Sequence, residues 1–314
     1  MITYFAKENK TLRPTGANEG NWVHITAPLD NSELEYLAEK EMVPLDFLLD
    51  PLDIDEKSRY EREEEVKLIV INVPVINTDE KESDALYITA PVGIIIKPNR
   101  ILTVTSVEND VVDRFLNDRV RNFDPNNQQR FVLQIFEQTV LQFLDVLKKL
   151  NLRRNIMEQE LYNSSRNKEL QQLLKIEKSL VYMLNSLSDN DLLKQKIKRT
   201  DFLGLRGDEA NQDLFEDIII DNSQALEMAN VHTNLLSSTM EAYASIISNN
   251  LNVVIHRLTT ITIVLMVPTI VFSFYGMNLE LPLKDYAATP YLVILLSLVL
   301  ALGLIAIFRR SDSV

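Results

Sequence analysis

The sequence predicts an α/β domain, followed by long helices and by two apolar C-terminal helices of membrane-spanning length. Segments rich in Val, Ile and Thr, which are typical of β-strands, lie almost entirely within residues 1–122. No proline occurs between Pro125 and Pro268, so no strong helix breaker of that kind interrupts this region. Two runs of 18 residues, 258–275 and 291–308, carry no charged side chain.

Composition narrows the class of protein. The chain of 314 residues has no cysteine, which excludes disulfides and thiolate metal ligands. Its histidines, His24, His232 and His256, are far apart, whereas zinc sites usually have two ligands at short spacing. The formal net charge of −13 disfavours nucleic acid as a partner. The sequence has no phosphate-binding glycine-rich loop and no nucleophile motif, so we expect neither an enzyme nor a bound cofactor.

The α/β domain is expected over residues 1–122, with a small and largely antiparallel sheet. The turn "KPNR" at 97–100 separates two strand-like segments and predicts a hairpin. Between the first two strand-like segments, the spacing of Leu and Phe over 32–52 predicts helices. The charged run 55–67 is expected to be a solvated face or loop. The four predicted strands have the sequences "NWVHITAP", "VKLIVINVPVI", "ALYITAPVGIII" and "RILTVTSV".

Residues 123–207 are expected to form a helical hairpin. A first helix is predicted from about residue 125 to 163, and a second helix covers "NKELQQLLKIEKSLVYMLNSL". The glycine-containing segment "LGLRGDEA" interrupts the helical pattern, and Asp208 is a plausible N-cap for the helix that follows.

One helix is predicted over residues 208–275. At 1.5 Å per residue it would be about 100 Å long, which is too long for a core element of a globular domain. We therefore expect a stalk that continues directly into the first apolar run, 258–275.

Both apolar runs are long enough to span a bilayer, which takes about 17–25 residues. A buried hairpin in a soluble protein is the alternative, but two such runs joined by a short loop fit a bilayer better. Basic residues set the orientation: Arg257, Arg309 and Arg310 flank the spans, whereas the loop 276–290 contains only Lys284. We expect both termini in the cytoplasm, the loop outside the cell and the tail 309–314 inside, with the plasma membrane as the location.

The two predicted spans differ in polarity. The second is apolar apart from Ser297, whereas weakly polar residues recur along the first, at steps of three or four after Thr259, which places them on one side of a helix. Either the hydroxyl groups bond to their own helix and serve in packing, or the stripe faces a water-filled lumen enclosed by several subunits. This polar stripe consists of Asn252, Thr259, Thr262, Met266, Thr269 and Ser273.

The segment "YGMN" follows the first span. Gly276 is expected to end the helix, because glycine readily takes the position after the last helical residue. The final carbonyl oxygens have no intrahelical partner there and carry the negative end of the helix dipole. Asn278 adds a neutral carboxamide oxygen. A ring of uncharged oxygens suits a hydrated divalent cation such as Mg²⁺, which gives up its water reluctantly.

"YGMN", preceded by a proline-bearing apolar helix and followed by one more span, resembles the CorA-type magnesium channels. The resemblance covers the whole architecture and implies a funnel-shaped homopentamer whose first span lines the pore. It implies that Gly276, Met277 and Asn278 form the outer selectivity element, and that Leu258 and Met266 form hydrophobic constrictions. The pore-lining positions that it implies are Asn252, Ile255, Leu258, Thr262, Met266, Thr269 and Ser273.

The resemblance also implies sensing of cytoplasmic Mg²⁺ by carboxylates between neighbouring subunits. Asp50 in "LLDPLD" and Asp217 in "FEDIII" match these positions. The expected function is therefore inward movement of Mg²⁺ through a pore gated by cytoplasmic Mg²⁺, with the lipid bilayer and further copies of the chain as partners. Two alternatives stay open: a relative that carries Zn²⁺, Co²⁺ or Ni²⁺ or exports its ion, and a membrane-anchored coiled-coil scaffold without transport.

Overall fold

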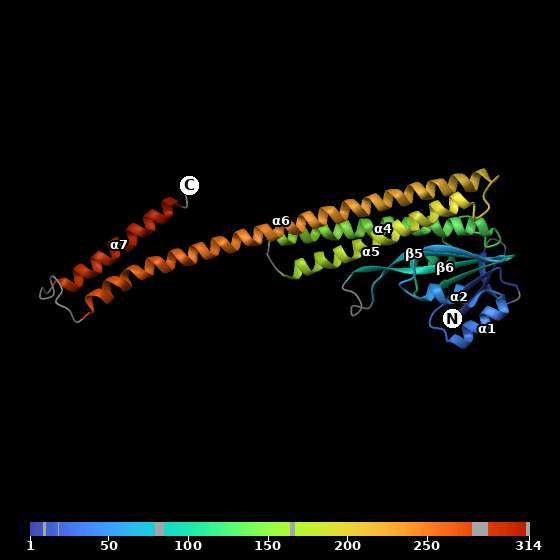
Figure 1. Ribbon diagram of the computed structural model, residues 1–314, viewed down its shortest axis with the longest axis horizontal. Helices are drawn as coiled ribbons and strands as arrows, with labels where there is room; N and C mark the ends of the chain where they lie inside the picture. The colour runs from blue at the N-terminus through green and yellow to red at the C-terminus, as the bar shows by residue number, and fades with distance from the viewer. Residues whose placement is uncertain (9–10, 18, 79–84, 164–166, 278–287, 312–314) are drawn as a thin grey trace. The chain divides into compact units, whose positions relative to one another are not determined.

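The computed structural model describes residues 1–8, 11–17, 19–78, 85–163, 167–277 and 288–311. The chain folds into two compact units, Met1–Ser238 and Thr239–Val314. The helix α6 (Glu209–Tyr275) belongs to both, and it confirms the prediction of one continuous helix in this region (Figure 1).

The first unit is built around a seven-stranded sheet in the order β2-β1-β3-β7-β6-β5-β4. Neighbouring strands are antiparallel except for β3 and β7, which run parallel with Trp22 opposite Ile101. The expectation of a largely antiparallel sheet is confirmed, as are the four predicted strands, but the expectation of a small sheet is wrong. The strands are β1 (Ile2–Glu8), β2 (Thr11–Thr15), β3 (Trp22–Thr26), β4 (Arg59–Glu63), β5 (Val66–Ile76), β6 (Tyr87–Lys97) and β7 (Arg100–Thr105).

The charged run 55–67, expected to be a solvated face or loop, is largely exposed, but it also contains a strand that the sequence did not predict. Arg59–Glu63 forms strand β4, which pairs with β5 at the edge of the sheet. Charged side chains are tolerated here because an edge strand has solvent on its free side, and they also discourage pairing with another chain.

Helices cover both faces of the sheet, so the first unit has three layers (Figure 1). On one face lie α1 (Asn31–Glu41), α2 (Leu45–Leu49) and the short 3-10 helix η1 (Asp50–Leu52). On the other face lie α3 (Asp110–Leu116), α4 (Gln128–Asn163) and α5 (Asn167–Thr200). Successive side chains of a strand point to opposite faces of the sheet, so each strand contributes to both cores. Trp22 packs with α3, α4 and α5, and the next residue, Val23, packs with α1 and α2.

The first part of α6 packs on this second layer. Asp208 caps the helix as predicted, because its Oδ1 accepts a hydrogen bond of 3.1 Å from the Asn211 backbone N–H. Gly204 and Gly207, both with positive φ, form the turn that precedes it. The buried positions repeat at steps of three and four as far as Ala229, and the last follows seven residues later, which is the pattern of a coiled-coil seam. They are Asn211, Phe215, Ile218, Asn222, Ala225, Ala229 and Leu236.

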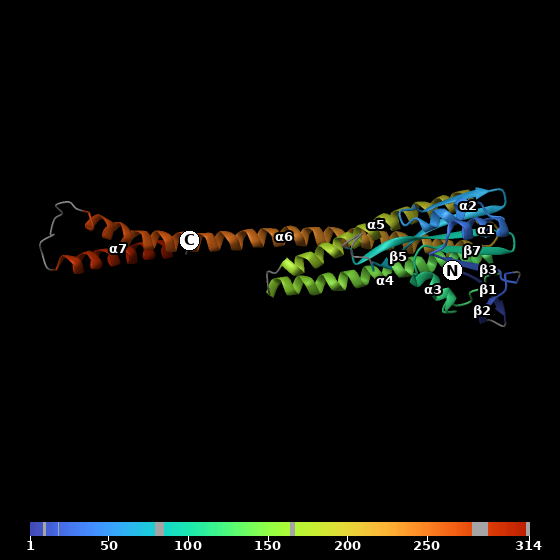
Figure 2. The ribbon, with the colours of Figure 1, turned by 90° about the horizontal axis from the view of Figure 1, so that it is seen from below.

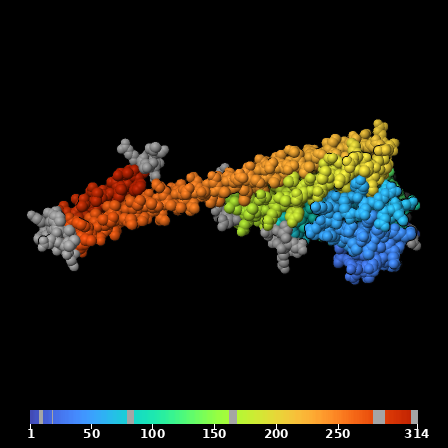
Figure 3. Space-filling view, viewed as in Figure 1, coloured from blue at the N-terminus to red at the C-terminus, as the bar shows by residue number. Residues whose placement is uncertain are grey.

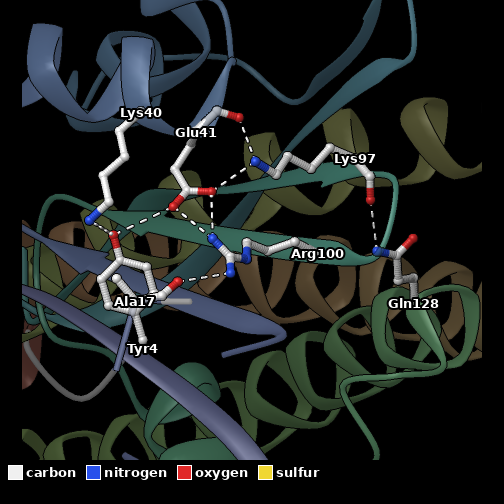
Figure 4. A network of polar contacts seen from close by, with 7 residues as sticks. All are labelled: Tyr4, Ala17, Lys40, Glu41, Lys97, Arg100 and Gln128. Carbon is white, nitrogen blue, oxygen red and sulfur yellow. Dashed lines mark hydrogen bonds and ion pairs between the residues drawn. The ribbon is translucent and has the colours of Figure 1, made fainter. Parts of the chain in front are cut away.

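A buried carboxylate connects α1 to the sheet (Figure 4). Glu41, at the end of α1, is 1% exposed and accepts hydrogen bonds from Lys97 (2.8 Å) and Arg100 (2.9 Å to each oxygen), which flank the β6–β7 turn. Arg100 also donates to the carbonyl of Ala17, and Gln128 donates to the carbonyl of Lys97. Burial raises the pKa of Glu41, but the hydrogen bonds from the two cations outweigh it, and the net effect lowers this pKa.

The second unit consists of the remainder of α6 and of α7 (Thr289–Ser311), which confirms the second predicted apolar helix. In both ribbon views α7 runs back along the end of α6, and the space-filling view shows the two in contact (Figures 1, 2 and 3). Pro268 lies inside α6 without ending it.

Candidate pore-lining helix

The apolar part of α6 has one partly covered side. The covered residues recur at helical spacing, and at about 100° per residue they fall on a single side of the helix. They are Thr260, Ile263, Val264, Val267, Pro268, Val271 and Tyr275. The buried residues of α7 recur at every fourth position and are mostly small, which permits close helix packing. They are Thr289, Val293, Ser297 and Ala301.

Ser297 lies on the covered side of α7. It is 2% exposed, and its hydroxyl donates to the Ile294 carbonyl at 2.8 Å. A hydroxyl satisfied within its own helix can be buried in an apolar contact without losing a hydrogen bond.

All seven predicted pore-lining positions are exposed in the single chain. At helical spacing they occupy an arc of about 120°, whose centre lies opposite the side that α7 covers. The polar stripe is therefore directed away from α7 rather than into the contact between the two helices.

The threonine hydroxyls of the stripe donate to their own helix. Thr259, Thr262 and Thr269 donate to the carbonyl oxygens four residues earlier, at 2.9, 2.8 and 3.0 Å. This is the bonding expected if the hydroxyls serve in packing, but it also leaves the oxygen lone pairs free to accept. The water molecules around a cation point their hydrogens outward, so a surface of acceptors complements a hydrated cation.

The end of α6 matches the predicted position. The helix ends at Tyr275, and the Gly276 N–H still donates to the Phe272 carbonyl at 2.9 Å. Gly276 does not adopt the left-handed conformation that glycine often takes after a helix. A β-carbon on Gly276 would lie 3.2 Å from that same carbonyl oxygen, so glycine permits a close approach here. Asn278, the third residue of the predicted selectivity element, lies outside the described residues.

The two predicted sensor residues are not brought together within one chain. Asp50 begins η1, on the face of the sheet covered by α1 and α2, whereas Asp217 is exposed on α6, which packs on the opposite face. A site that joins them requires a second chain. Among the described residues no group of three His, Asp or Glu side chains is placed to hold a metal ion.

Asp50 has a partner that the sequence did not suggest. The guanidinium of Arg59 forms an ion pair with Asp50 and also bonds Glu56 (2.9 Å) and Glu61 (2.5 Å). Burial raises the pKa of Asp50 more than the positive charge of Arg59 lowers it. The sequence signal was the presence of two arginines, Arg59 and Arg62, among the carboxylates of the charged run 55–67, and spacing alone did not show which carboxylates Arg59 would bond.

The apolar windows of α6 and α7 are not core segments of the folded chain. In the most apolar 18-residue stretch of α6 no residue is buried, and in that of α7 17% of the residues are buried. Both stretches are long and apolar enough to span a bilayer. The chain thus has an α/β domain that one continuous helix joins to apolar segments of spanning length, which is the organisation of a helical membrane protein.

The chain belongs to the CorA-like Mg²⁺ transporter family, whose sequence model matches residues 17–310. It is thus a member of a family of membrane transporters for divalent cations, and the resemblance seen in "YGMN" is confirmed. No match is found among curated protein sequences.

Solved structures share the fold. The complete CorA magnesium transporter from Methanocaldococcus jannaschii is 23% identical, with a TM-score of 0.83 over 99% of this chain and 98% of that one. The full-length CmaX protein is 16% identical, with a TM-score of 0.72 over 99% of this chain and 97% of its own. The ZntB cytoplasmic domain from Vibrio parahaemolyticus is 10% identical, with a TM-score of 0.60 over 79% of this chain and 98% of that domain.

Proposed function

We propose that this chain conducts hydrated Mg²⁺ into the cell through a pore lined by the exposed stripe of α6 in a homopentamer. The observation that carries the proposal is the placement of the stripe: its positions are exposed and lie opposite the side that α7 covers. One helix cannot enclose a lumen, so several copies must converge on an axis. The number five, the inward direction and the cytoplasmic position of both termini come from the resemblance to CorA-type channels and from the flanking basic residues.

The chemistry of the stripe fits a cation that keeps its water. Mg²⁺ sheds its hydration shell reluctantly, so a lumen that passes it must accept hydrogen bonds from that shell. The threonine oxygens and the backbone carbonyls at the end of α6 are such acceptors, and none of them carries a formal charge that would hold the ion too tightly. Leu258 and Met266 supply apolar constrictions along the same side.

Single cysteines test which side of α6 meets water, because the natural chain contains none. Met266→Cys lies on the stripe and the adjacent Val267→Cys lies on the covered side. Each variant is reconstituted in liposomes with a magnesium-sensitive dye, and flux is measured before and after a permanently cationic methanethiosulfonate is added. We expect the reagent to block most of the flux through Met266→Cys, because a fixed positive charge in the lumen repels the ion, and to leave flux through Val267→Cys unchanged.

Equal block of both variants, or block of Val267→Cys alone, would contradict this assignment of sides. Absence of flux through the unmodified protein would refute transport and favour the scaffold alternative. Competition by Zn²⁺, Co²⁺ and Ni²⁺ in the same liposomes measures ion preference; stronger conduction of one of these than of Mg²⁺ would replace the proposed ion.

We further propose that Asp50 of one chain and Asp217 of its neighbour sense cytoplasmic Mg²⁺, and Arg59 provides a matched test. Asp50→Ala and Asp217→Ala should each move inhibition of flux to higher internal Mg²⁺, because a carboxylate ligand is lost. Arg59→Gln should have the opposite effect, since it releases the Asp50 carboxylate. An ion pair this exposed contributes about 0.5–1 kcal/mol, so inhibition should occur at about two- to fivefold lower Mg²⁺. Unchanged inhibition in all three variants would rule out the proposed sensor.

A further inference from the structure

A lysine lies fully buried where α4, α5 and α6 meet. Lys194 of α5 is 0% exposed, and its Nζ donates to Oδ1 of Asn222 of α6 at 2.6 Å. The Nζ also lies 5.8 Å from the centre of the Phe136 ring of α4. A buried ammonium normally pairs with a carboxylate, because an unpaired charge is strongly disfavoured away from water. Here its hydrogen-bond partner is a neutral amide.

The carboxylate that acts on Lys194 electrostatically, that of Asp191, is engaged elsewhere. Asp191, one turn earlier on α5, accepts hydrogen bonds from Gln195 (2.6 Å), Ser223 (3.2 Å) and the Asn222 amide (3.4 Å). Within the described part of the chain, Lys194 forms no ion pair with it. Asp191 is the charged group that influences Lys194, while α4 presents Phe136 and α6 presents Asn222, both uncharged. Burial outweighs the effect of Asp191 and lowers the pKa of Lys194 to about 7.

Asn222 holds α6 in register. It occupies one of the buried seam positions of α6, is itself fully buried, and donates from Nδ2 to the Leu187 carbonyl of α5 at 3.1 Å. A polar pair in an otherwise apolar helical seam typically specifies register at the expense of stability. The Lys194–Asn222 pair therefore sets both where α6 sits on α5 and how firmly it is held.

We propose that the Lys194–Asn222 pair is a proton-responsive latch, which holds α6 firmly on α5 when the amine is neutral and loosens it when the amine is protonated. Both states can be accommodated without breaking the bond to Asn222, since a neutral amine still has two N–H donors. The protonated state differs from the neutral state in holding a buried charge. That charge favours any opening of the α5–α6 contact that admits water.

The sign and the pH window follow from linkage. Below about pH 7, Lys194 is protonated in both the packed and the opened form, so opening does not depend on its titration. Above that pH, the packed form holds a neutral amine while the opened form still binds the proton. Packing is then favoured by about tenfold for each further pH unit, until the ordinary lysine pKa is approached.

Hydrogen–deuterium exchange of the full-length protein in lipid nanodiscs measures this directly. After correction for intrinsic exchange rates, the protection of amides in α6 near Asn222 should rise about tenfold per unit between pH 7 and 9 in the natural protein. Lys194→Met should show high protection with no pH slope. The control Lys196→Met removes an exposed lysine two residues away on the same helix and should keep the natural slope.

A second variant and a second measurement keep the test decisive even if Lys194→Met misfolds. Asn222→Asp places a carboxylate beside the amine, so the lysine should stay charged and the slope between pH 7 and 9 should disappear. Titration of the lysine 13Cε resonances should show one group near pH 7 that is missing in Lys194→Met. A natural protein without a slope, or a slope that persists in Lys194→Met, would overturn the proposal.

His232 of α6 also has a lowered pKa, and its titration ends near the lower edge of the chosen pH window. Burial and the neighbouring Arg154 of α4 lower its pKa below the ordinary histidine value of 6.5. Arg154 itself lies 3.7 Å from the Glu158 carboxylate on the same helix. His232 is therefore neutral in both forms above about pH 7.5 and contributes no slope there.

The consequence for transport rests on the proposed function. Because α6 continues into the predicted pore-lining segment, a looser hold on its first part should make flux depend on internal pH. Liposome flux at internal pH 6.5 and 8.5 should differ in the natural protein and agree in Lys194→Met. Equal flux in the natural protein would refute coupling to the pore, while the exchange experiment decides the latch itself even if no flux is found.

Discussion

Asn278→Ala is expected to reduce Mg²⁺ flux at least tenfold. In the proposed pore the carboxamide oxygens of several subunits accept hydrogen bonds from the water shell of the ion, and alanine removes them all. Loss of a single hydrogen bond costs about 1 kcal/mol, so a ring of them readily exceeds the 1.4 kcal/mol that corresponds to a factor of ten. The measurement is uptake into liposomes loaded with a magnesium-sensitive dye.

Asn250→Ala is the matched control for this substitution. Asn250 is an exposed asparagine of α6, and the helical period places it on the side away from the stripe. Its loss should leave flux within about twofold of the natural protein. If Asn278→Ala conducts as well as Asn250→Ala, the role assigned to the end of α6 is wrong, whatever the pore-lining side is.

Glu41→Gln is expected to lower the free energy of unfolding of the α/β unit by about 3 kcal/mol. The substitution keeps the shape of the side chain but leaves Lys97 and Arg100, whose side chains are 14% and 20% exposed, facing an uncharged amide. The single tryptophan reports this unit, since Trp22 is fully buried in its sheet core. Urea unfolding of the detergent-solubilised protein, followed by Trp22 fluorescence, measures the effect.

Glu39→Gln, an exposed position on the same helix, provides the control and should change stability by less than about 0.5 kcal/mol. The pH dependence supplies a further check. Because the pKa of Glu41 is lowered in the folded state, its contribution is present above the ordinary glutamate pKa and is lost as the pH falls below it. The Gln variant should therefore lose less stability than the natural protein between pH 5 and 3, and an equal loss would contradict the assignment.

Local composition predicted most elements of the fold, and it failed where tertiary context decides. The strands rich in Val and Ile and the long proline-free helices were predictable because their residue types favour one conformation. Strand β4 was not, since "RYERE" has little preference for a sheet and is extended because it pairs with β5. Strands β1 and β2 were missed for a similar reason: they pair with each other and with β3, over residues whose pattern is mixed.

The candidate site was predictable in its residues but not in its setting. The spacing of Thr262, Met266 and Thr269 was enough to place them on one side of a helix. Which side α7 covers could not be predicted, because both helices are apolar and their contact depends on the small residues of α7. The ion pair between Asp50 and Arg59 depends on how strand β4 approaches η1, which sequence spacing does not encode.

The flank next to the stripe is entirely hydrocarbon. Val254, Ile261, Leu265 and Phe272 are all exposed, about a quarter turn around α6 from the threonines. Swivelling each subunit's α6 by that quarter turn would exchange hydroxyl groups for alkyl and aromatic surface, and a narrow lumen lined in that way expels its water column. The pore would then close by rotation of α6 about its own axis, without a plug and without bending of the helix.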